Sequence, residues 1–109
     1  MKNIFKIIVV IILFVICMGE FMGYQLVFTT GISMYPTFRD KQFILAKEVE
    51  MGELQENDIG LYWNPETETW INHRVIYKTK TGYIFKGDNN FYFDDFVPRE
   101  LVKYKVIVY

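Results

Sequence analysis

An apolar run from Ile4 to Tyr24 restricts what this chain can fold into more than any other feature of its sequence. Apart from glycines it is broken only by Lys6 and Glu20, and its length is close to the roughly 20 residues with which an α-helix crosses a bilayer. Lys6 can snorkel toward head groups at one end, and Phe21 and Tyr24 suit the interface at the other. We therefore predict one transmembrane helix.

A cleaved signal peptide also begins with basic residues and an apolar middle. Its cleavage site would need small residues at alternate positions, which the stretch Cys17–Glu20 lacks, and further apolar residues follow. We expect residues 1–24 to be a retained anchor of a single-pass membrane protein. Because Lys2 and Lys6 stand at the start of the chain, the N-terminus is expected in the cytoplasm, and residues 25–109 outside it or in a secretory lumen.

Composition limits the remaining function classes. The chain has 109 residues, 51% of them hydrophobic, which suits one small domain beyond the anchor. Acidic and basic residues are mixed along residues 25–109, so nothing indicates a nucleic-acid partner. Cys17 is the single cysteine, which rules out an internal disulfide and a cysteine-based zinc site. We expect no metal and no cofactor.

Residues 25–109 are predicted to form an all-β domain. Short runs rich in Val, Ile, Tyr, Phe and Trp alternate with turn residues, which is typical of antiparallel strands. The one rival for a helix, residues 48–57, is acidic and is expected to be a solvated loop. We predict a small, partly closed antiparallel barrel or sandwich. The expected strands are 25–28, 42–46, 59–63, 70–71, 74–78, 83–86 and 102–109.

A serine between a predicted strand and a proline turn is the first candidate for chemistry. In the segment Gly31–Phe38, Pro36 keeps the preceding residue out of the helical region, so Ser33 lies in extended or turning chain. Such a position can hold a hydroxyl out of the backbone ladder, as a nucleophile requires. The competing interpretation is a strand followed by a turn, with Ser33 making only local hydrogen bonds.

A serine nucleophile needs a base, and that base needs an orienting group. His73 is the only histidine and stands at the start of a predicted strand, where a structural role is the alternative. For the orienter, Asp88, Asp94 and Asp95 lie in turn and loop sequence, although aspartates also simply make turns. A calcium loop is disfavoured, because the residues after Asp88 include neither the required glycine nor a closing glutamate.

Several separated stretches resemble one family, the type I signal peptidases, in the same order. Gly31–Phe38 is similar to the family's nucleophile segment, residues 57–65 to its Gly-Asp-Ile strand, and His73–Ile76 with Gly87–Asn90 to its base-bearing and acidic segments. The tail 96–102 resembles its closing stretch. The likeness covers nearly all of residues 25–109, and the histidine before Arg-Val is that of the archaeal and endoplasmic-reticulum type.

The resemblance implies a membrane-bound serine endopeptidase that removes signal peptides from exported preproteins, with its active-site face close to the membrane lipid. It implies Ser33 as nucleophile, His73 as general base and an acidic residue as orienter. Where some relatives have a serine that donates to the oxyanion, this chain has Gly31, so the backbone N–H of Ser33 is expected to contribute there. Accessory subunits are left open.

The orienter is expected to be Asp95, because it follows Asp88 at a spacing that resembles bacterial relatives. Asp88 is expected to support the site and Asp94 to face solvent, since neighbours in extended chain point to opposite sides.

Two other functions are compatible with parts of the sequence. One is a membrane-anchored β module that binds a protein partner without catalysis. The other, a self-cleaving repressor-type peptidase, is disfavoured because a bilayer-length helix stands where a DNA-binding portion would be needed.

Overall fold

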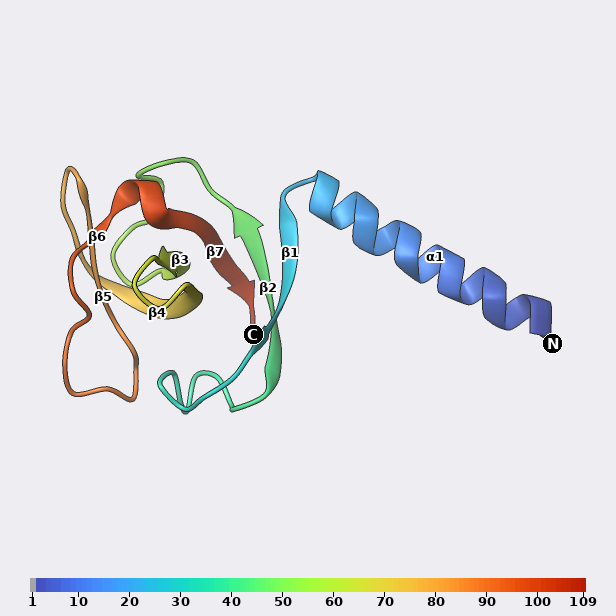
Figure 1. The fold of residues 1–109 in the computed structure, drawn as a ribbon, viewed down its shortest axis with the longest axis horizontal. Coiled ribbons are helices and arrows are strands. Elements are labelled where there is room, and N and C mark those ends of the chain that lie inside the picture. The colour runs from blue at the N-terminus through green and yellow to red at the C-terminus, as the bar shows by residue number, and fades with distance from the viewer. Residues whose placement is uncertain (1) are drawn as a thin grey trace.

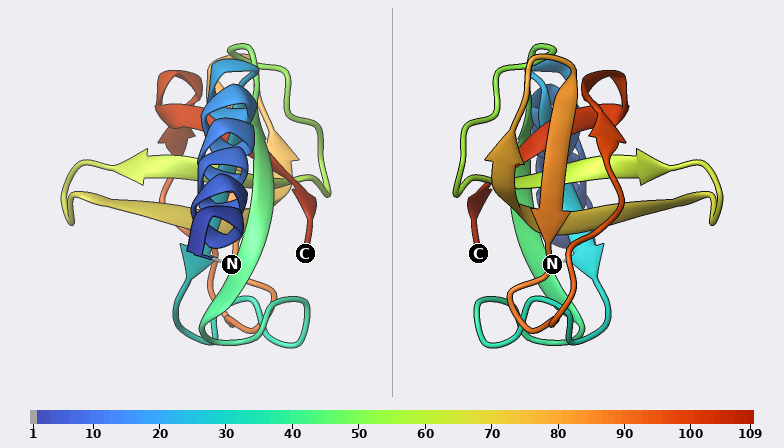
Figure 2. Two further views of the ribbon diagram at one scale, coloured as in Figure 1. Left: turned by 90° about the vertical axis from the view of Figure 1, so that its right-hand side faces the viewer. Right: turned by 90° about the vertical axis from the view of Figure 1, so that its left-hand side faces the viewer.

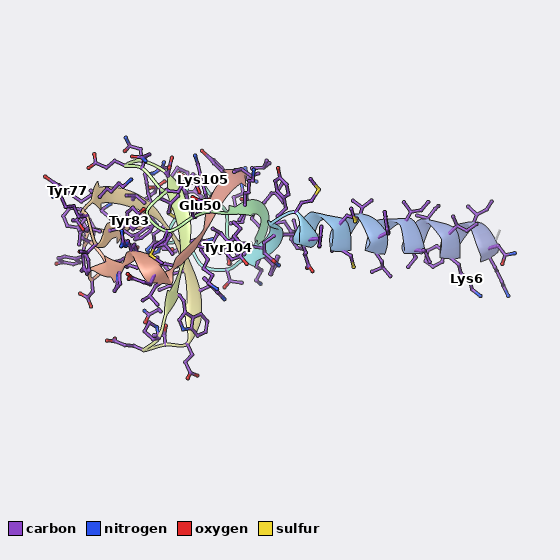
Figure 3. The ribbon with its side chains drawn as sticks, turned by 90° about the horizontal axis from the view of Figure 1, so that it is seen from above. Lys6, Glu50, Tyr77, Tyr83, Tyr104 and Lys105 are labelled. Carbon is purple, nitrogen blue, oxygen red and sulfur yellow. The ribbon has the colours of Figure 1, made fainter. Side chains whose placement is uncertain are left out.

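The computed structural model describes residues 2–109, which form one helix followed by an antiparallel sheet (Figure 1). Helix α1, Lys2–Phe21, has no buried residue, and Figure 3 shows it standing clear of the domain with its side chains pointing outward. In the part of the chain that the structure describes, α1 alone is long and apolar enough to cross a membrane, a property that signal sequences share. A helix that is apolar all round needs apolar surroundings, which the domain does not supply.

Within residues 2–109, seven strands follow α1, and the expected antiparallel β domain after an apolar helix is confirmed. All neighbouring pairs are antiparallel, in the order β1-β2-β7-β3-β4-β5-β6, and the sheet is not closed, because β1 and β6 do not pair. The strands are β1 Tyr24–Thr29, β2 Gln42–Glu48, β3 Ile59–Asn64, β4 Thr69–Lys78, β5 Gly82–Lys86, β6 Val97–Pro98 and β7 Val102–Val108, with a short 3₁₀ helix at Arg99–Leu101 before β7.

The strand boundaries differ from the sequence prediction in two informative places. Tyr24, expected at the end of the membrane helix, is the first residue of β1. The two short strands expected around residues 70–78 are one strand, because Asn72 and His73 pair with Leu61 and Gly60 of β3. Tertiary pairing has overridden the weak β-propensity of Asn72 and His73. His73 therefore lies in the middle of a strand, with neighbours on both sides.

The curled sheet encloses two groups of buried side chains. One lies between β2, β3, β7 and the turn after β1. The other lies between β3, β4, β5, β6, the start of β7 and the loop before β3. Figure 2 shows the β3–β4 hairpin projecting sideways from this body. The first group is Met34, Phe38, Ile44, Ala46, Ile59, Leu61 and Val106, and the second is Leu54, Tyr62, Val75, Tyr83, Phe85, Val97 and Val102.

Candidate functional site

Three side chains from three separate parts of the chain form one hydrogen-bonded line. Ser33 comes from the turn between β1 and β2, His73 from β4, and Asp94 from the loop between β5 and β6. The Ser33 Oγ lies 3.1 Å from His73 Nε2, and His73 Nδ1 lies 2.5 Å from Asp94 Oδ2. Each imidazole nitrogen thus has one partner, with the hydroxyl on one side and the carboxylate on the other.

The imidazole lies in a largely enclosed place. His73 is only 8% exposed, whereas Ser33 and Asp94 are half-buried. Hydrogen bonds to an ionised group are stronger away from bulk water, so the carboxylate can hold the ring in one orientation. This arrangement is able to take a proton from Ser33 at Nε2 while Nδ1 stays protonated toward Asp94.

The turn that presents Ser33 is fixed by packing on both sides of the serine. Met34 and Phe38 are both 3% exposed and enter the first buried group. The Phe38 N–H donates to the carbonyl of Met34, and the Tyr35 N–H to the carbonyl of Ile32. Because its neighbours are buried, Ser33 is carried at the surface of a rigid turn.

Gly31 occupies a backbone conformation that favours glycine. Its φ is +95°, and its N–H donates to Asp40 Oδ1 at 2.8 Å. A serine at this position would have to adopt left-handed backbone geometry, which L-residues other than glycine rarely do. The turn uses the N–H groups of Gly31, Tyr35 and Phe38 for its own hydrogen bonds. The N–H of Ser33 is not among these structural donors.

Asp88 lies beside the line of three side chains without joining it. Arg74, the residue after His73, donates to both carboxylate oxygens of Asp88 at 2.9 Å. Thr37 donates to Asp88 Oδ2 at 2.6 Å. The Arg74 hydrogen bonds, helped by that from Thr37, hold the pKa of Asp88 below its ordinary value. Asp88 thus joins the serine turn to β4.

The expectation that Asp95 would face His73 is wrong, since Asp94 occupies that place. The Asp94 N–H donates to the carbonyl of Phe85 at 2.8 Å, which sets the segment so that the Asp94 side chain points inward. The next residue then points away, and Asp95 is exposed. Only one of the two neighbours faces the histidine, as the alternation of side chains in extended chain requires, and it is the residue before the expected one.

Tyr62 of β3 is a member of the site that no motif in the sequence marks. It is 5% exposed, and its hydroxyl donates to Asp94 Oδ2 at 2.7 Å. Burial, and next the hydrogen bond to Asp94, raise the pKa of Tyr62. The β3–β4 register pairs Gly60 with His73 and Tyr62 with Ile71, so Tyr62 lies diagonally from His73 on the same face. The position of Tyr62 beside the site follows from the register of β3 with β4, which the sequence alone does not give.

Tyr62 and Asp94 also line a hollow of about 520 Å³. Its walls include Trp63, Phe93 and Asp95. Among residues 2–109, no group of three or more histidine, cysteine or acidic side chains is arranged to hold a metal ion. The side chains that meet at the site are the Ser33 hydroxyl, the His73 imidazole and the Asp94 carboxylate.

In comparisons with protein-family models, curated proteins and solved structures, nothing matched this chain.

Proposed function

We propose that this chain is a membrane-anchored serine endopeptidase that removes signal peptides from exported preproteins. The observation that carries the proposal is the hydrogen-bonded line from Ser33 through His73 to Asp94. Geometry of this kind supports acyl transfer, because the hydroxyl, base and orienter lie within hydrogen-bond reach of one another. The resemblance to the histidine type of signal peptidase supplies the substrate class.

In the proposed reaction, Ser33 Oγ attacks the carbonyl carbon of the scissile peptide bond while His73 Nε2 takes the hydroxyl proton. His73 then gives this proton to the leaving amine, and a water molecule activated by His73 hydrolyses the acyl-enzyme. Asp94 holds the imidazole through Nδ1 and stabilises its cation. The backbone N–H of Ser33, which the turn does not use, is the candidate donor to the oxyanion.

The position of the helix supports a membrane substrate. Only Met22 and Gly23 separate α1 from β1, so the catalytic domain would be held close to the surface that α1 enters. Ile32, Tyr35 and Phe91, in the turns around Ser33 and Asp94, are exposed apolar side chains. A signal peptide, itself an apolar segment in the bilayer, would be presented to such a site as it leaves the membrane.

The test is cleavage of a purified preprotein with an Ala-X-Ala site by the full chain in detergent. We expect cleavage by the wild type, and a loss of about 10⁴-fold in rate for Ser33→Ala and for His73→Ala. Lys86→Ala is the matched control, because Lys86 donates to the Gly87 carbonyl and not to Ser33. More than a few per cent of wild-type activity in Ser33→Ala would contradict the proposal.

Labelling by a serine-reactive phosphonate separates the enzyme from a non-catalytic binding module. An activated Ser33 should react with the probe in the wild type and not in His73→Ala. A folded wild-type protein that neither reacts nor cleaves would favour the module that binds a protein partner.

A further inference from the structure

We infer that Tyr62 is a positioning residue for the proposed peptidase reaction: its hydroxyl holds Asp94 in place and, through Asp94, sets the orientation and basicity of His73. This inference rests on the proposed function for its catalytic meaning. The hydrogen-bond chain itself is measurable whether or not the protein cleaves peptides.

Two donors converge on one oxygen atom. Asp94 Oδ2 accepts from the Tyr62 hydroxyl at 2.7 Å and contacts His73 Nδ1 at 2.5 Å. Asp94 lies in a loop without regular structure, and the bond from its backbone to Phe85 does not by itself fix the rotation of the carboxylate. The hydrogen bond from the Tyr62 hydroxyl of β3 restrains the carboxylate itself.

Tyr62 is suited to act as a fixed donor. Its ring centroid lies 4.7 Å from that of Phe85, inside the second buried group. The pairing of β3 with β7 shifts register between Leu61 and Tyr62, an irregularity of the kind that redirects a side chain. Burial and Asp94 raise the pKa of Tyr62, so its hydroxyl stays protonated where a histidine titrates.

The hydrogen bond from Tyr62 should weaken the interaction by which the Asp94 carboxylate stabilises the protonated form of His73. A hydroxyl that donates to a carboxylate draws negative charge away from it, so less is left to stabilise the imidazolium. Without the hydroxyl, His73 should be protonated more readily and should lose its ability to act as a base at a higher pH.

The other charged groups around His73 are already engaged or lie further out. Arg74 is paired with Asp88, and Lys105 of β7 lies 3.5 Å from Asp58. Lys86 of β5 donates to the Gly87 carbonyl, and the exposed Asp95 follows Asp94 in the chain. These pairs are unchanged by removal of one tyrosine hydroxyl, so they act equally on the wild type and the variant.

The experiment is a pH titration of His73 by nuclear magnetic resonance in the full chain in detergent micelles, produced without a histidine tag. Because His73 is the only histidine, its imidazole signals are unambiguous. In Tyr62→Phe, which keeps the ring, we expect the titration midpoint to rise by about 0.5 to 1 pH unit. On the preprotein substrate we expect kcat to fall about tenfold with KM nearly unchanged.

Tyr83→Phe is the matched control. Tyr83, labelled in Figure 3, is 1% exposed in the same buried group, and its hydroxyl donates to the Leu54 carbonyl at 3.2 Å. The Tyr83→Phe variant therefore loses a buried tyrosine hydrogen bond that does not reach the site. We expect the His73 midpoint and kcat to stay at wild-type values in this variant.

Equal midpoints in the wild type and Tyr62→Phe would overturn the inference, whatever the cleavage assay gives. A raised midpoint in a protein that cleaves no preprotein would support the hydrogen-bond chain and contradict the proposed function. Should Tyr62→Phe not fold, incorporation of 3-fluorotyrosine keeps every hydroxyl and makes it a stronger donor. The midpoint must then fall, in the wild type and in Tyr83→Phe alike, and an unchanged midpoint overturns the inference.

Discussion

Gly87 lies so close to Ser33 that a Cβ atom added to the glycine would stand 2.6 Å from the Ser33 carbonyl oxygen. The same carbonyl accepts a hydrogen bond from the N–H of Asn89 at 2.8 Å. The turn after β5 and the turn after β1 are therefore in direct backbone contact. The position of Ser33 relative to His73 depends on this contact, because it holds the serine turn against the domain.

Gly87→Ala is expected to displace the serine turn. The added methyl group meets a backbone atom, and it also meets Asn90 Nδ2 at 2.6 Å, so something must shift. We expect about 1 to 3 kcal/mol of destabilisation, as for overpacking elsewhere, and at least a tenfold lower cleavage rate. Gly19→Ala serves as the control, because a Cβ added there would lie 4.0 Å from the Tyr24 Cβ, an ordinary contact distance. This variant should be close to wild type in denaturant unfolding and cleavage.

The two neighbouring aspartates should behave oppositely. Asp94→Asn keeps the shape of the side chain but removes the charge that orients His73, so we expect a folded protein with about 10⁴-fold slower cleavage. Asp95→Asn should cleave at nearly the wild-type rate, since the Asp95 side chain is exposed. The measurement is kcat for both variants, with circular dichroism to verify folding. The reverse ranking would contradict the placement of Asp94 as orienter.

The stability that Asp88 contributes to the domain should be lost in acid. The folded pKa of Asp88 lies below the ordinary 3.8, chiefly because Arg74 donates to it. A lowered pKa contributes stability that is present above about pH 4 and is lost as the pH falls through the folded value. Asp88→Asn should be less stable than wild type at pH 7, and the difference should shrink by pH 3. Urea unfolding at both pH values measures this, and Asp95→Asn is the exposed control.

Gly31→Ser is expected to weaken the site, although some members of the family that the sequence resembles have a serine at this place. At φ +95° the new side chain is strained by about 1 kcal/mol or more. We expect lower stability and no gain in kcat from an added oxyanion donor. A variant that cleaves faster than wild type would show that the turn can relax to use the new hydroxyl.

Helix α1 is expected to remain attached and to anchor the domain. Its side chains from Lys2 to Phe21 are exposed, which would be costly in water. In membrane vesicles, alkaline carbonate should leave the full-length chain in the pellet. Protease added on the non-cytoplasmic side should degrade the domain and leave a small embedded fragment. Release of a shortened soluble domain would instead indicate a cleaved signal sequence.

The sequence by itself determined those features that depend on local pattern. The length and apolarity of the run before Tyr24 predicted the free-standing helix, and the short β-rich runs predicted antiparallel strands. The candidate nucleophile and base, Ser33 and His73, could be named because each stands out in composition or local chain geometry. The structure brings these two side chains within 3.1 Å of one another.

Only the tertiary structure decided which acid faces the imidazole and what holds that acid. Side chains in extended chain alternate between two faces, so a shift of one residue exchanges Asp94 and Asp95, and no local pattern records the shift. The register is set by the Asp94 hydrogen bond to Phe85 and by the pairing of β3 with β4. Those same long-range contacts bring Tyr62 to Asp94, because strands that are distant in sequence become neighbours only when the sheet has formed.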